Sequence, residues 1–98
     1  MHDAAVALAR QIMDGKAGNV PDWGYRMLAC GSTDVLVILM PHLTDKEQAM
    51  RERAAVALGN MGAAAAPAAS QITAAIALAS TEREKRLLQW SLTQAQSE

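Results

Sequence analysis

This chain of 98 residues is poor in cysteine and in aromatic side chains: it has one cysteine, two tryptophans, one tyrosine and no phenylalanine. A single cysteine excludes an internal disulfide and a cysteine-based metal cluster, and it favours a reducing compartment such as the cytosol. Cys30 stands among Leu28, Ala29 and Gly31 with no adjacent basic residue to activate its thiol. We therefore predict that Cys30 is buried packing and not a nucleophile.

An excess of charge of one sign is also absent. The formal net charge is −1, which gives no long-range attraction for polyphosphate. Arginines gather at Arg51 with Arg53 and at Arg83 with Arg86, but glutamates are interleaved with both groups. A solvated helix face of mixed charge is therefore favoured over a nucleic-acid surface.

Targeting segments are not evident. The first residues, MHDAAVALARQIMDG, include Asp3 and lack the basic region and adjoining apolar core of a secretory signal, so they are expected to form the first folded helix. Residues 62–81 carry no charge and are long enough to cross a membrane. We reject a membrane span because this stretch contains Pro67 and several polar residues, and its many alanines are only weakly apolar.

Catalytic and metal-binding motifs are missing as well. The sequence has no phosphate-cradling glycine loop, nucleophile elbow or His-Glu-x-x-His helix. His2 is terminal and His42 follows a proline, so scattered carboxylates would have to supply most of the three or four ligands of a metal site. Paired carboxylates such as Glu82 and Glu84 are explained by helix capping. The sequence predicts no enzyme activity and no cofactor.

The composition that remains favours helices. Hydrophobic residues make up 51% of the chain and aromatic residues only 3%, and alanine, which is abundant, has the highest helix propensity, whereas strands prefer branched and aromatic residues. A chain of this length can bury one small core. We predict one all-α domain over residues 1–98.

Apolar periodicity and end signals predict six helices. The first covers residues 2–13, a loop covers 15–22, and a short second helix covers 23–30. A third runs from 32–34 to about residue 43, with Pro41 kinking or closing it. Its branched run, residues 35–40, leaves a buried strand as an alternative. The expected inward positions of the first helix are Ala5, Leu8, Ala9 and Ile12.

Two capping boxes, Thr44 to Glu47 and Thr81 to Glu84, are predicted to open the fourth and sixth helices. Pro67 suits the first turn of the fifth helix, where its missing amide is not needed. The two boxes are 37 residues apart, a spacing of the order that paired-helix repeats show. The inward positions expected for the last two helices are Ile72, Ala75, Ile76 and Ala79, then Leu87, Leu88, Ser91, Leu92 and Ala95.

Residues 50–62, MRERAAVALGNMG, are the most informative segment. Positions i, i+4, i+7, i+8 and i+11 form one apolar stripe, which must bury against other helices. The alanines of this stripe allow a neighbouring helix axis to approach toward the short end of the range of about 8–10 Å. Gly59 and Gly62 offer flexible or left-handed stops. The stripe consists of Met50, Ala54, Ala57, Leu58 and Met61.

This segment resembles the second helix of a HEAT-like repeat, of the bacterial PBS-lyase type. The family pattern is an apolar residue, Arg, two variable positions, Ala-Ala, one variable position, Ala-Leu-Gly and a later Gly. Here it is filled by Met50, Arg51, Ala54, Ala55, Ala57, Leu58, Gly59 and Gly62. The resemblance is best over residues 32–98, although Leu87, Leu88 and Thr93 depart from it in the last helix. It implies an α-α superhelix of about three antiparallel helix pairs; a compact six-helix bundle is the alternative.

The resemblance also suggests roles for Asp45 and Arg51. In HEAT-like repeats an Asp in the turn between paired helices and an Arg near the start of the second helix form a ladder between adjacent repeats. Asp45 and Arg51 occupy these positions, so we expect an inter-repeat hydrogen bond and a structural role for both.

In HEAT-like arrays the second helices line a concave surface that binds other proteins. The resemblance therefore implies a cytoplasmic, non-catalytic scaffold, adaptor or regulatory module with a protein partner. Core packing remains an alternative for the aromatic residues of this face. The expected partner-binding residues are Trp23, Tyr25, Arg26, Glu52, Val56 and Trp90.

Three other functions stay open. One is a lyase-associated module that holds a bilin-type or other small ligand between helices. Another is binding to the nucleic-acid backbone through Arg51, Arg53, Arg83 and Arg86, which the charge balance disfavours. The last is a homo-oligomer in which exposed repeat ends stack on one another.

Overall fold

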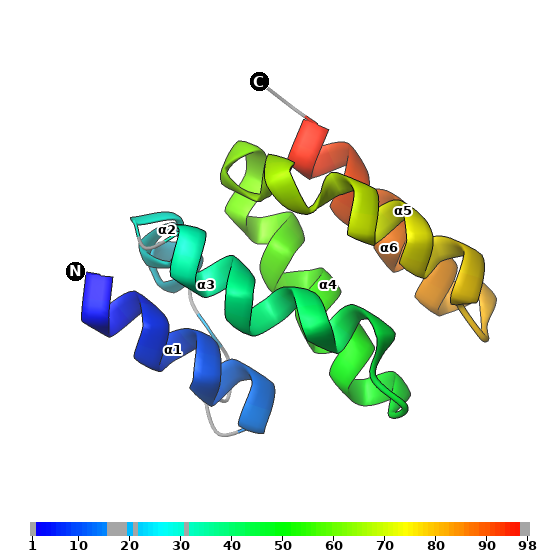
Figure 1. Cartoon of the computed structure of the whole chain (residues 1–98), viewed down its shortest axis with the longest axis horizontal. Coiled ribbons are helices and arrows are strands. Elements are labelled where there is room, and N and C mark those ends of the chain that lie inside the picture. The colour runs from blue at the N-terminus through cyan, green and yellow to red at the C-terminus, as the bar shows by residue number, and fades with distance from the viewer. Residues whose placement is uncertain (1, 16–19, 21, 31, 97–98) are drawn as a thin grey trace.

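The computed structural model describes residues 2–15, 20, 22–30 and 32–96, and every element in these residues is helical (Figure 1). The all-α prediction is therefore confirmed. The elements are α1 (His2–Asp14), α2 (Asp22–Cys30), α3 (Ser32–Leu39), the 3₁₀ helix η1 (Met40–Thr44), α4 (Gln48–Met61), the 3₁₀ helix η2 (Gly62–Ala68), α5 (Ala69–Leu78) and α6 (Glu82–Gln96).

The helices form two layers of consecutive neighbours. In one layer α1 packs on α3, and η1, which continues α3, packs on α5. In the other layer α2 packs on α4, and α4 packs on α6. Each member of the first layer also contacts the helix that follows it in the second layer, which gives three successive helix pairs. Helix α4 lies in the middle and contacts elements of all three pairs (Figure 1).

The core runs through both layers and is built largely from alanine and aliphatic residues. In α4, Ala54, Ala57 and Leu58 are fully buried and Met61 nearly so, whereas Met50 is only partly covered. Because alanine side chains are short, they let the axes of neighbouring helices come close, as the sequence predicts. The core members elsewhere include Ala5, Ala9, Ile12, Met13, Leu28, Val35, Leu39, Leu43, Ile72, Ala75, Leu88 and Ala95.

The helix boundaries follow the predicted ones closely, with two corrections. The branched run of residues 35–40 is helical, so the strand alternative is wrong; η1 follows α3, and Pro41 lies inside it. Pro67 lies within η2, before α5 begins. The predicted loop begins at Gly15, which adopts a φ of 75°, but its residues 16–19 and 21 fall outside the described part.

Only one of the two predicted capping boxes forms a side-chain cap. Thr81 Oγ1 accepts the Glu84 backbone N–H at 3.1 Å, as expected for the start of α6. The Thr44 hydroxyl instead donates to the Pro41 carbonyl at 3.4 Å, and Glu47 is the N-cap of α4. Asp45 Oδ1 instead accepts the Glu47 N–H at 3.0 Å, which forms an Asx turn just before α4.

The two glycines at the end of α4 have different structural roles. Gly62 ends the helix with φ 61° and ψ −134°, a conformation that is costly for residues with a Cβ atom. Gly59 lies inside the helix and is buried, so its prediction as a helix stop is wrong. A Cβ atom at Gly59 would collide with the indole ring of Trp90, and glycine is therefore required for close approach of α6.

Cys30 is exposed, which corrects the prediction that it is buried. It is the last residue of α2, and its thiol donates a weak hydrogen bond to the Arg26 carbonyl at 4.0 Å. The helical stripe of α2 places Leu28 in the core instead. The apolar residues next to Cys30 do not predict its burial, because Cys30 lies at the end of the helix, where the chain reaches the surface.

The stretch Gln48–Leu78 is long and apolar enough to cross a membrane by length and composition, and residues 23–30 with 33–44 would qualify only as a span bent by 110°. The first stretch comprises α4, η2 and α5, and the chain changes direction at Gly62 (Figure 1). The buried residues of α4 are part of the core of the domain. In the stretch Gln48–Leu78, 28% of the most apolar window is buried inside the domain.

Candidate functional site

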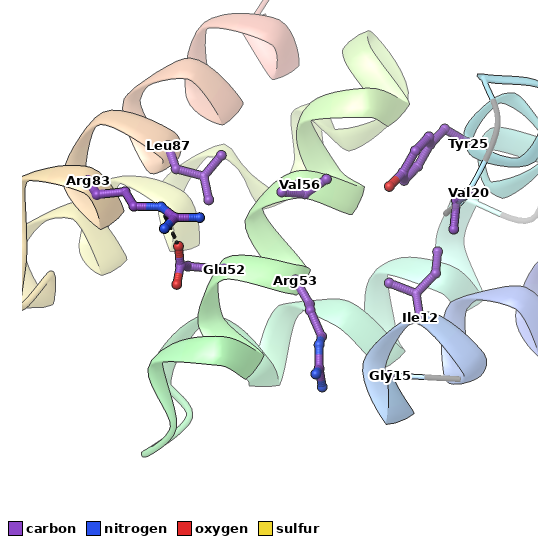
Figure 2. Close-up of a pocket in the computed structure, with 9 residues that line it drawn as sticks. All are labelled: Ile12, Gly15, Val20, Tyr25, Glu52, Arg53, Val56, Arg83 and Leu87. Carbon is purple, nitrogen blue, oxygen red and sulfur yellow. Dashed lines mark ion pairs between the residues drawn. The ribbon is translucent and has the colours of Figure 1, made fainter. Parts of the chain in front are cut away.

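A groove with a volume of about 470 Å³ opens on the layer formed by α2, α4 and α6 (Figure 2). Helix α4 supplies its centre through Glu52, Arg53 and Val56. Helix α6 supplies one side through Arg83 and Leu87. The opposite side comes from Tyr25 on α2 together with Ile12, Gly15 and Val20. The groove is therefore built by all three helix pairs and cannot exist in any one pair alone.

Residues on α4 and α6 face one another in a constant register. Glu52 pairs with Arg83, Val56 and Leu87 line the same groove one turn further on, and Gly59 lies beneath Trp90 after another turn. Each of these three pairs is separated by 31 residues in the chain. Along the two facing helices the pairs are thus charged, then aliphatic, then aromatic, and the charged and aliphatic pairs line the groove.

The polar end of the groove contains an ion pair between the two helices. Arg83 Nε lies 3.3 Å from Glu52 Oε1, and the side chain of Arg83 is 86% exposed while that of Glu52 is 21% exposed. An exposed pair of this kind contributes little to stability because water and salt screen it. Arg83 can therefore turn toward a bound group at little cost to the fold.

Arg53 contributes a second guanidinium on the other side of α4. Its Nη1 donates to the Met13 carbonyl at 3.2 Å and lies 3.3 Å from the Met50 sulfur. Met13 is in the last turn of α1, where a cation is favourable because of the helix dipole. Arg53 therefore closes the end of α1 while its remaining N–H groups border the groove.

Tyr25 completes the polar groups of the groove. It is half-buried, and burial raises the pKa of its hydroxyl above the ordinary value of 10.0. The hydroxyl therefore stays neutral at physiological pH and can donate a hydrogen bond. With Arg53 and Arg83, the polar lining consists mainly of hydrogen-bond donors, and Arg83 already occupies the one carboxylate of the lining, that of Glu52.

A second polar assembly, centred on Arg51, joins the second and third helix pairs. Arg51 Nη1 donates to the carbonyls of Asp45 at 2.8 Å and Lys46 at 3.1 Å, in the turn before α4. Its Nε and Nη2 donate to the two carboxylate oxygens of Glu84 on α6, the second at 3.3 Å. Arg51 therefore ties its own turn to the following helix pair.

Glu84 is 1% exposed, and three groups besides Arg51 stabilise its charge and position. The Ser80 N–H and hydroxyl donate to its Oε2 at 2.9 and 3.1 Å, and its own N–H donates to Thr81. Hydrogen bonding by Arg51 is the largest cause of a pKa below the ordinary value of 4.5, and it outweighs the opposing effect of burial. Glu84 is therefore a paired, ionised carboxylate inside the structure.

This geometry corrects the predicted roles of Asp45 and Arg51. Arg51 does link two helix pairs, but the carboxylate that it binds belongs to Glu84, and Asp45 contributes only its backbone carbonyl. The Asp45 carboxylate accepts the Glu47 N–H and lies 3.3 Å from His42 Nδ1. The Glu47 hydrogen bond is the largest cause of a lowered Asp45 pKa.

We expect the stability of the chain to fall in acid. Glu84 and Asp45 have folded-state pKa values below their ordinary values of 4.5 and 3.8, so the unfolded chain binds protons more readily than the folded chain. Their stabilising contribution is complete above these ordinary values and is lost as the pH falls through the lower folded values. Thermal unfolding followed by circular dichroism between about pH 7 and about pH 3 will measure the loss.

The variant Glu84→Gln removes the most deeply buried of these titrations and should flatten the pH dependence. Glu82→Gln is the matched control, because Glu82 is exposed in the first turn of the same helix. If the midpoint temperatures of Glu84→Gln and Glu82→Gln decline equally steeply in acid, Glu84 is not the titrating group.

The predicted partner-binding residues divide into three groups. Tyr25, Glu52 and Val56 line the groove. Trp23, which is 67% exposed, and Arg26 are on the surface of α2 outside the lining. Trp90 is 39% exposed and its ring covers Gly59, so packing between helices and partial exposure are combined in one side chain.

Five lining residues besides Gly15 were not among the predicted ones: Ile12, Val20, Arg53, Arg83 and Leu87. The predicted inward stripes do include Ile12 and Leu87, but the position of the next helix decides whether such residues also border a groove. The mixed charge around Arg53 and Arg83 indicated only a solvated face. The register between α4 and α6, which brings these charges together, is not visible in either helix alone.

No group of three or more His, Cys, Asp and Glu side chains among the described residues lies close enough to hold a metal ion. Glu84 is buried and bound by Arg51, so it cannot reach a substrate in the groove. The groove offers apolar contacts, two guanidinium groups, one phenol and the Glu52 carboxylate.

Comparison with known proteins finds no matching family model, no matching curated protein and no matching solved structure.

Proposed function

We propose that this chain is a HEAT-like helical-repeat domain that binds a partner protein in the groove between α2, α4 and α6. The role is that of a non-catalytic scaffold, adaptor or regulatory module, with the cytoplasm as the proposed setting. The motif of residues 50–62 and the layered helix pairs support the repeat assignment. The groove supports the binding role.

The observation that carries the proposal is the half-buried aliphatic centre of the groove. Val56 on α4 and Leu87 on α6 line the same groove, and neither belongs to the fully buried core. Val20 and Tyr25 present further partly covered apolar surface across from them. Covering these groups with apolar atoms removes them from water, which favours association by roughly 25 cal/mol for each Å² buried.

The arrangement of arginines favours a protein over nucleic acid. Arg51 is held by Glu84 and two backbone carbonyls, and Arg83 faces Glu52. A phosphate-binding surface needs several cations that are free to contact adjacent phosphates. Only Arg53 and Arg86 of the four arginines considered have no ion pair among the described residues.

Site-directed photo-crosslinking tests the proposal. The photoreactive residue p-benzoylphenylalanine replaces Val56 in the groove, or Thr73 on the exposed side of α5 as the control. After irradiation in cells, we expect a discrete protein adduct from the Val56 position that the Thr73 position does not give, and mass spectrometry identifies the adduct. Unchanged circular dichroism of both proteins verifies that they fold.

A companion substitution, Val56→Glu, should abolish the complex with the identified protein while leaving the helical melting transition in place. The substitution replaces an aliphatic contact at the centre of the groove with a carboxylate, so the bound state loses apolar burial and must remove a charge from water. If the adducts from Val56 and Thr73 are the same, or if Val56→Glu retains full binding, the groove is not the partner-binding surface.

A small ligand is the second candidate, because the volume of about 470 Å³ lies within the usual range of roughly 300–1,000 Å³ for such sites. The ligand would be a bilin-type or other small molecule held between helices. Native mass spectrometry of the chain purified from its own cells distinguishes the two candidates: a stoichiometric non-protein adduct supports the small ligand, and bare chain mass counts against it.

A further inference from the structure

We infer that the groove selects an acidic segment of its partner: a short stretch in which aliphatic side chains are accompanied by at least one aspartate or glutamate. This inference rests on the proposed function and specifies the chemistry of the partner. Its basis is the combination of one apolar centre and a surplus of positively charged donors around it.

The charges that line the groove are unbalanced. Arg53 and Arg83 contribute two positive charges and Glu52 contributes one negative charge. The net charge of the whole chain is −1, so the positive sign is a property of this surface and not of the molecule. An incoming carboxylate therefore meets a local field opposite in sign to that of the chain as a whole.

The hydrogen-bonding groups have the same preference. Each guanidinium carries five N–H donors and no acceptor. Arg53 uses Nη1 on the Met13 carbonyl, and Arg83 uses Nε on Glu52. The neutral Tyr25 hydroxyl adds another donor. A partner rich in acceptors satisfies these groups, whereas a basic partner would leave donors facing donors, which is costly once water is excluded.

Glu52 makes the preference selective. It holds Arg83 in the free chain at 3.3 Å, and it repels a carboxylate placed on top of it. The partner carboxylate is therefore directed to the outer side of Arg83 or to Arg53, away from Glu52. The aliphatic side chains of the segment then lie over Val56 and Leu87, with the acidic group beside them.

Peptide selection tests this inference directly. A library of random peptides is selected on the complete chain, with Val56→Glu used to discard peptides that bind outside the groove. We expect the retained peptides to be enriched in aspartate or glutamate beside aliphatic residues. Replacing the acidic residue of a retained peptide by its amide should weaken binding about tenfold, as measured by fluorescence anisotropy.

Two charge reversals on α6 form a matched pair. Arg83→Glu changes a groove residue, whereas Lys85→Glu makes the same change in charge at an exposed position outside the groove lining. We expect Arg83→Glu to weaken peptide binding about tenfold and Lys85→Glu less than about twofold. Both positions are exposed, so neither variant is expected to lose its fold.

The outcomes separate the inference from the proposed function. Retained peptides without acidic enrichment, or equal effects of the two reversals, would overturn the acidic preference and leave the protein-binding function standing. A library that yields no peptide dependent on Val56 would overturn both. Shifts of a labelled DNA or RNA duplex, or a dimer in light scattering that Arg83→Glu dissociates, would assign the groove to nucleic acid or to a second copy.

Discussion

Glu84→Ala should destabilise this chain by about 3 kcal/mol. Glu84 is almost completely buried and accepts hydrogen bonds from Arg51 and from the Ser80 N–H and hydroxyl. Removing the carboxylate leaves those donors without their acceptor inside the structure, and this cost exceeds the modest net worth of the pair itself. The hydrogen-bonded link from Arg51 to the third helix pair is lost with it.

Thermal unfolding by differential scanning calorimetry measures this effect. For a domain of this size, 3 kcal/mol corresponds to a midpoint lowered by roughly 12 °C or more. Glu84→Gln retains a hydrogen-bond acceptor at the same place and should fall between wild type and alanine. The exposed Glu82→Ala is the control and should change the free energy of unfolding by about 0.5 kcal/mol at most. Equal midpoints for the alanine variants of Glu82 and Glu84 would contradict the role of Glu84.

Gly59→Ala should also destabilise the chain, although alanine is the better helix former. The new Cβ would lie 2.7 Å from Cη2 and 2.8 Å from Cε3 of Trp90, and closer still to Cζ3. Overpacking of this kind costs about 1–3 kcal/mol, whereas exchanging glycine for alanine inside a helix returns about 1 kcal/mol. We therefore expect a net loss of up to about 2 kcal/mol, with the indole ring displaced toward water.

The sign of this effect should depend on Trp90. In a Trp90→Ala background the collision is gone, so Gly59→Ala should stabilise the chain by up to about 1 kcal/mol through helix propensity. Chemical denaturation of wild type, Gly59→Ala, Trp90→Ala and the double variant gives the coupling free energy between positions 59 and 90. Fluorescence in a Trp23→Phe background follows Trp90 alone, because the chain has two tryptophans, and should shift to the red in Gly59→Ala. If Gly59→Ala lowers the free energy of unfolding equally with and without Trp90, contact with Trp90 is not the cause of the destabilisation.

The local features of this fold could be predicted from the sequence because they depend on residues close together in the chain. The Thr81 cap, the closing of the third helix near Pro41 and the alanine stripe of residues 54–57 all appear in the structure at the expected places. The same reasoning failed at Thr44, where a nearby Asp45 competes for the same amide group and caps the turn instead.

The sequence position of Glu84 fits two interpretations, a buried charge on the apolar stripe of α6 or a capping residue at the start of the helix. Glu84 precedes Leu88, Ser91 and Ala95 at helical spacing, and all three are buried, so a charge on this stripe requires a buried partner. Its position three residues after Thr81 gave a sufficient local explanation as a capping residue. The sequence does not identify Arg51 as the partner, because the two residues are 33 positions apart in the chain and meet only in the folded structure.

The sequence by itself determined that the chain is helical, where most helices begin and end, and which faces of them are apolar, because these properties follow from propensity, capping and periodicity within one segment. Only the tertiary structure decided that Arg51 binds Glu84, that Gly59 makes room for Trp90, and that Arg53, Val56, Arg83 and Leu87 border one groove. These relations depend on the register and distance between α4 and its neighbours. Close packing of the small side chains of α4 sets that register, and no single helix contains it.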